Sequence, residues 1–96
     1  MKVAVVAHVT VKDGMAQEFE AVVYRHRTLV HEHEPGAEVY ELFRSRTQPN
    51  HYTFLEIYRD AAAYQAHAVN SYLDPGRRLL YAMHDGAPDI QLFDGM

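Results

Sequence analysis

Two hydrophobic patterns alternate along this chain of 96 residues. In four segments the side chains alternate between two faces, as they do in β-strands. These segments are Lys2–Val11, Ala37–Arg46, Tyr52–Tyr58 and Asp89–Phe93. Between the first two segments the period changes to that of a helix. Its apolar stripe consists of Met15, Phe19, Val22, Val23 and Val30.

The stripe predicts a long amphipathic helix from Met15 to about His33, ended by Glu34-Pro35-Gly36. A second, short helix follows the third strand, with Asp60 as its N-cap. A third helix is expected to begin with Asp74 as its cap and to end by Gly86. It should turn Leu79, Leu80 and Met83 inward.

This order of elements predicts one α+β domain over residues 1–96. Right-handed crossovers convert it into a ferredoxin-like βαββαβ fold, a four-stranded antiparallel sheet with the helices on one face. The first and third strands are apolar on both faces, yet the helices can cover only one. We therefore expect a homodimer packed sheet face against sheet face, because a second copy can cover the remaining face.

Composition narrows the class of protein. The net charge of −4 gives no basic surface for nucleic acid, and Cys is absent, which excludes disulfides and thiolate metal sites. No apolar run approaches the ~18 residues of a membrane span. We expect a cytoplasmic protein with a small-molecule partner and no nucleic-acid or membrane partner.

The third strand and second helix hold the best candidates for chemistry. Glu56 shares its strand face with Tyr52, Phe54 and Tyr58, an unusual place for a carboxylate without a partner or a task. His67 lies on the helix stripe that can face that strand, and a histidine can exchange protons near neutral pH. We expect Glu56, Tyr58 and His67 to be catalytic. The alternative is a structural ion pair at Glu56 and a packed histidine at position 67.

Four further residues are expected to contact a ligand. His8 and His26 interrupt the apolar faces of the first strand and the first helix, so both are predicted to line one cavity. Tyr40 and Phe54 would supply aromatic walls, and the Tyr40 hydroxyl can orient a ligand oxygen. Core packing is the alternative for each of them.

For two other polar clusters, binding of a metal or an anion is not the simplest interpretation. His31 and His33 are two residues apart, so they do not face each other on a helix and are poorly placed to bind a metal. Arg77-Arg78 follows a helix start and could bind an anion, although a surface pair is the simpler interpretation.

Three segments carry a resemblance to a known family. They are Val11-Lys12-Asp13-Gly14 before the long helix, Glu34-Pro35-Gly36 before Tyr40-Glu41-Leu42, and Glu56-Ile57-Tyr58 followed by Ala66-His67. With the order of elements, they resemble the antibiotic biosynthesis monooxygenase domain over roughly Val3 to Phe93. The resemblance implies a dimeric α+β barrel with a cavity between sheet and helices for an aromatic or carbonyl-rich ligand.

The family contains cofactor-independent monooxygenases and heme-degrading enzymes. The heme-degrading branch has Asn, Trp and His at places that here hold His8, Tyr58 and the Arg77-Arg78 region. Heme degradation is therefore not expected. The resemblance implies oxidation of a quinol- or anthrone-like aromatic without cofactor or metal. From the placement of the residues we expect His67 to be the proton acceptor, oriented by Glu56, with Tyr58 and His8 positioning oxygens. Proton-transfer isomerisation or lysis, and ligand binding without catalysis, are the alternatives.

Overall fold

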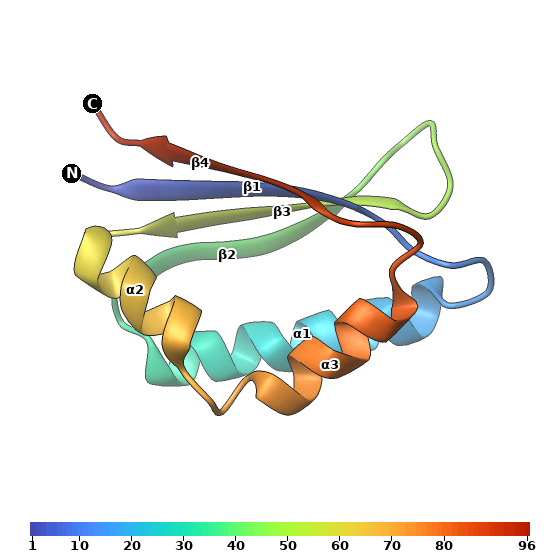
Figure 1. Cartoon of the computed structure of the whole chain (residues 1–96), viewed down its shortest axis with the longest axis horizontal. Helices are drawn as coiled ribbons and strands as arrows, with labels where there is room; N and C mark the ends of the chain where they lie inside the picture. The colour runs from blue at the N-terminus through green and yellow to red at the C-terminus, as the bar shows by residue number, and fades with distance from the viewer.

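The computed structural model describes all 96 residues of the chain. The elements run β1 (Val3–Thr10), α1 (Ala16–His33), β2 (Ala37–Arg44), β3 (His51–Tyr58), α2 (Ala61–Val69), α3 (Asp74–Met83) and β4 (Asp89–Asp94). The strands form one antiparallel sheet in the order β2-β3-β1-β4. Figure 1 shows α1 and α3 beneath the sheet and α2 at the end of it where both termini lie. This arrangement confirms the predicted ferredoxin-like fold.

The start of α3 differs from the prediction. Asp74 is the first helical residue rather than the cap, and Leu73 occupies the cap position without a side-chain hydrogen bond. The expected inward stripe is also only partly right, because Leu80 and Met83 are buried while Leu79 is 48% exposed. The cap on α2 is as predicted, since the Asp60 side chain accepts a 2.8 Å hydrogen bond from the backbone N–H of Ala63.

The core lies between the sheet and the helices. The predicted stripe of α1 is buried there, including His26, which is 4% exposed. On the sheet side, alternate residues of β1 and β3 pack against that stripe. The apolar faces of the strands and of α1 thus pack against each other in one core, and the polar residues on those faces are buried with the apolar ones.

No helix covers the opposite face of the sheet (Figure 1). Paired positions of an antiparallel sheet share a face, so the registers assign this surface directly. Its apolar members are Ala4, Val6, Val39, Phe43, Leu55, Ile57 and Phe93. Phe43 and Phe93 are 54% and 50% exposed. We call these seven residues the uncovered face.

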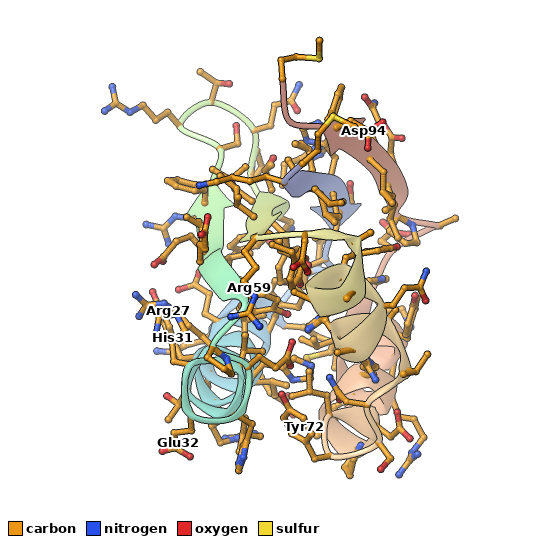
Figure 2. All side chains as sticks on the ribbon, turned by 90° about the vertical axis from the view of Figure 1, so that its left-hand side faces the viewer. Arg27, His31, Glu32, Arg59, Tyr72 and Asp94 are labelled. Carbon is orange, nitrogen blue, oxygen red and sulfur yellow. The ribbon has the colours of Figure 1, made fainter.

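Figure 2 looks along the helices from the end of the sheet where α2 lies, and shows α1 and α3 side by side beneath the strands. The labelled His31 and Glu32 are on the outside of α1, and both are exposed. Tyr72, in contrast, lies on the inner side, between α1 and α3. From there its hydroxyl donates a hydrogen bond to Glu34.

Candidate active site

A cavity of about 130 Å³ remains between the sheet and the helices. Both the sheet and the helices contribute residues to its lining. Its polar lining residues are His26, Tyr40, Glu56, His67, Arg77 and His84, and its apolar sheet-side residues include Ala7, Val9 and Phe54. A small apolar cavity with a few convergent polar groups is the usual form of a ligand site.

A larger hollow of about 460 Å³ lies at the β2–β3 hairpin end and is lined by His8, Thr53 and Asp89 among others. Its His8, His51 and Asp89 are exposed, and its buried titratable lining residue, Tyr52, already donates its hydroxyl to Glu20. We place the candidate site in the smaller cavity, because several buried titratable groups with perturbed pKa values converge there, as they do at functional sites.

Local structure brings His67 to this cavity. The Asp60 cap sets the start of α2, and His67 follows Ala63 by one helical turn on the same side. At Ala63 the helix passes close to Gly36, where an added Cβ would lie only 2.6 Å from the Ala63 Cβ. A glycine at position 36 therefore allows α2 to approach the start of β2.

Glu34 holds the ring of His67. Its Oε1 is 2.9 Å from Nδ1 of His67, and its Oε2 accepts hydrogen bonds from Asn70 and from the hydroxyl of Tyr72. The Glu34 side chain is only 9% exposed. A carboxylate that accepts from every neighbour requires the proton of His67 to be on Nδ1, which leaves Nε2 as an acceptor.

Nε2 of His67 makes no hydrogen bond within the protein. It points toward Glu56, whose Oε1 is 3.8 Å away and beyond hydrogen-bond distance. That oxygen instead accepts a 2.6 Å hydrogen bond from the Tyr58 hydroxyl. Burial raises the pKa of Glu56, against the opposing effects of the Tyr58 hydrogen bond and of His67. The His67 ring is thus held between two carboxyl groups at the edge of a cavity.

His26 and Arg77 form the helical side of the cavity. Burial lowers the pKa of His26 to about 4, and the nearby Arg77 and His67 act in the same direction. The ring lies against the first turn of α3, where a Cβ on Gly76 would be 2.5 Å from Nδ1. Arg77 donates 2.7 Å hydrogen bonds to the carbonyls of His67 and Asn70, so it satisfies acceptors at the end of α2.

Several predicted site residues do meet in this cavity. His67, Glu56, His26, Tyr40 and Phe54 all line it. Tyr58 does not line it, because its fully buried ring lies behind Glu56, with which its hydroxyl is bonded. It contributes to the site through that carboxyl group and through its ring, whose centroid is 5.2 Å from that of His67.

Two expectations are corrected. His8 is exposed on the helix-free side of the sheet, where its Nδ1 lies 2.8 Å from Oγ1 of Thr53, so it does not share a cavity with His26. The reason is that both faces of β1 are apolar, and alternation does not indicate which one the helices cover. The group that orients His67 is Glu34 rather than Glu56.

Two residues of the site, Glu34 and His84, were missed from the sequence, and Arg77 was considered for anion binding but interpreted more simply as part of a surface pair. For His84 and Arg77 a signal existed, because Arg77, Leu80 and His84 recur at i+3 and i+4 and so share one side of α3 with its buried stripe. Glu34 is the residue after the last of α1 and stands at i+4 from Val30, so it continues the buried stripe, but its place in the helix-ending Glu34-Pro35-Gly36 hid that signal.

No group of three or more His, Cys, Asp or Glu side chains is arranged to hold a metal ion. No helix combines the length and apolar character that crossing a bilayer requires.

The fold and the cavity define a small α+β protein with a partly polar cavity between its sheet and its helices. The chain belongs to the antibiotic biosynthesis monooxygenase family, whose model matches residues 2–73. Among the curated proteins, none matches the chain.

Solved structures agree with this assignment. A Caulobacter crescentus CB15 protein proposed to be an antibiotic biosynthesis monooxygenase is 33% identical, with a TM-score of 0.94 over 99% of this chain and 90% of its own. SnoaB, a cofactor-independent oxygenase from Streptomyces nogalater, is 25% identical, with a TM-score of 0.87 over 99% of this chain and 93% of its own. A Nitrosomonas europaea protein at 15% identity and a TM-score of 0.90, over 99% of this chain and 90% of its own, shows the same fold.

Proposed function

We propose that the protein is a cofactor-independent monooxygenase that oxidises a small electron-rich aromatic, of the quinol or anthrone type. One observation carries the proposal: Glu34 holds Nδ1 of His67, while Nε2 is unbonded beside the cavity. This is the arrangement of a histidine base whose tautomer is set by a carboxylate. The similarity to SnoaB supports the same chemistry.

In the first step Nε2 of His67 accepts a proton from the bound phenol or from the acidic CH₂ of an anthrone. The imidazolium is then stabilised by Glu34 at Nδ1 and by Glu56 on the other side. The positive charge of Arg77, in the wall of the same cavity, stabilises the substrate anion. The protein thereby raises the electron density of the ring without taking up electrons itself.

In the second step the substrate carbanion, which is electron-rich, forms a carbon–oxygen bond with O₂. Protonation gives a hydroperoxide, and its O–O bond breaks with loss of water to leave a carbonyl. A CH₂ group and O₂ thus give C=O and H₂O, with both electron pairs supplied by the substrate. No external reductant is needed, and the protein's tasks are positioning and proton transfer.

The same groups would serve an isomerase or lyase that acts by proton transfer, because that chemistry also needs one positioned base and a cavity. It differs by consuming no oxygen. A protein that only binds its ligand would give saturable binding and no product.

The test is oxygen uptake with product detection across a panel of hydroquinones and anthrones. His67→Ala and His67→Gln should lower turnover by about 10²- to 10⁴-fold, the usual contribution of a general base. His67→Gln keeps a donor for Glu34 and so separates loss of the base from loss of the network. His31→Ala, which removes an exposed histidine on α1, is the matched control and should turn over normally.

Uptake that persists unchanged in both His67 variants would contradict the assigned base. Product formation without oxygen uptake would replace the oxygenase by the proton-transfer alternative.

We also propose that two copies pack through the uncovered face. Its seven apolar residues form a continuous surface across four strands, and two of its phenylalanines are half-exposed in the single chain. Contiguous apolar patches of this kind are rare on monomers and mark association surfaces. A symmetric partner that presents the same surface would cover it.

A further inference from the structure

His84 lies at the opposite end of the cavity from His67. Its backbone forms a bridge with Val11, whereas Glu56, the neighbour of His67, pairs with Val5. The stretch from Val5 to Val11 spans roughly 20 Å at the rise of an extended strand, and side chains that reach inward shorten that span. Ala7, Val9 and Phe54 line the space between the two ends. The cavity therefore carries an imidazole at each end, with these apolar residues on the sheet side between them and His26 and Arg77 on the helical side.

The two imidazoles differ in their hydrogen bonds. Nδ1 of His67 is bonded to Glu34, but both ring nitrogens of His84 are shielded from solvent and have no hydrogen-bond partner in the protein. The nearest rings, Phe19 at 6.1 Å and Tyr81 at 5.2 Å between centroids, pack against His84 without bonding to it. Buried polar groups in proteins are nearly always paired, so two unpaired nitrogens on a residue that lines a cavity require a reason.

The chemistry of the His84 ring limits the kind of ligand group that can pair with it. Burial lowers its pKa, so the ring is neutral at neutral pH. A neutral imidazole has one donor and one acceptor nitrogen. It can pair with a hydroxyl or a carbonyl oxygen, whereas a carboxylate or phosphate would favour a cationic partner.

We propose that His84 binds a second oxygen of the ligand, at the far end of the cavity from His67. The ligand is then an aromatic with an oxygen at each of two opposite ends, such as a dihydroxylated or keto-hydroxylated ring system. This deepens the oxygenase proposal and rests on it for the role of the His67 end. A ligand with a single oxygen would leave one of the two imidazoles unpaired.

The experiment measures binding without turnover. Under nitrogen, the affinities of 2,6-dihydroxynaphthalene and of 2-naphthol, which lacks one hydroxyl, are compared by calorimetry for wild type, His84→Phe and His84→Gln. Wild type should bind the diol about fivefold to tenfold more tightly, the effect of one buried hydrogen bond. His84→Phe should bind both compounds equally, and His84→Gln should keep part of the preference. His31→Gln is the control and should behave as wild type.

The ring ¹⁵N resonances of His84 give an independent readout, since they should shift with the diol and not with 2-naphthol. A His84→Phe variant that keeps the preference, or a wild type that shows none, overturns the proposal. The result is independent of catalysis. A preference that disappears in His84→Phe supports the two-ended site even if no oxygen uptake is found, in which case only the oxygenase proposal fails.

Discussion

The two faces of the sheet are built from the same strands but differ in the side chains that they carry. On β3, the positions that face the helices are Tyr52, Phe54, Glu56 and Tyr58, all buried, while the intervening positions include Leu55 and Ile57 on the uncovered face. On β3 the helix-covered side thus carries the buried titratable groups, and the uncovered face carries apolar ones. The difference shows that alternation along one strand can bury polar groups on one side while it leaves apolar ones unburied on the other.

The helix-covered face supports those polar groups by pairing most of them. Glu34 accepts from three donors, and the Tyr58 hydroxyl bonds to Glu56. Burial without such partners would be costly, because an unpaired buried polar group loses its hydration without compensation. The seven apolar side chains of the uncovered face have no polar groups and take part in no such network.

The largest effect is expected from breaking the Glu34 network. Glu34→Ala leaves His67, Asn70 and Tyr72 without their common acceptor. The free energy of unfolding should fall by about 3 kcal/mol, as for loss of one partner in a buried charged network. Urea denaturation measures it. Glu32→Ala, an exposed neighbour at the same helix end, is the matched control and should change little. Equal losses in both variants would show that the network is not a stabilising unit.

Association through the uncovered face can be tested by introducing a charge. Ile57→Glu should weaken dimerisation by roughly 50-fold, because an unpaired carboxylate would be buried between the two sheets. Sedimentation velocity over a concentration series gives the dissociation constant. Gln65→Glu adds the same charge on the exposed side of α2 and should leave association unchanged. A wild-type chain that stays monomeric at high micromolar concentration would refute the dimer.

The smallest expected effect is a pH dependence of the free energy of unfolding, which comes from titratable groups buried on the helix-covered side. The pKa of His26 falls from 6.5 to about 4 on folding, so the unfolded chain binds the extra proton. This contribution to stability is present above pH 6.5 and is lost as pH falls toward 4. The raised pKa of Glu56 acts in the opposite direction, since its contribution is present below pH 4.5 and is lost at higher pH.

The measurement is therefore a difference between variants. His26→Gln should lose less stability than wild type between pH 6.5 and 4, as followed by thermal unfolding. His31→Gln removes an exposed histidine on the same helix and should follow wild type. Parallel curves for wild type and His26→Gln would mean that His26 titrates alike in both states.

Much of the fold could be predicted because its signals are local. Alternation located the four strands, the α1 stripe included His26, and Asp60 indicated the start of α2. The approach of His67 to Glu56 also followed from these periods, because each residue has a definite side on its own element. The start of α3 was displaced by a residue, since Asp74 and Leu73 both stand at the helix boundary and only the backbone distinguishes them.

The amino-acid sequence by itself determined which side chains share a face, since strand and helix periods depend only on neighbouring residues. Only the tertiary structure decided which face the helices cover, and so it placed His8 outside and Glu56 inside. It also joined Glu34 to His67 and set His84 at the far end of the cavity. These contacts link segments that are distant in the chain, and no local period carries information about how such segments meet.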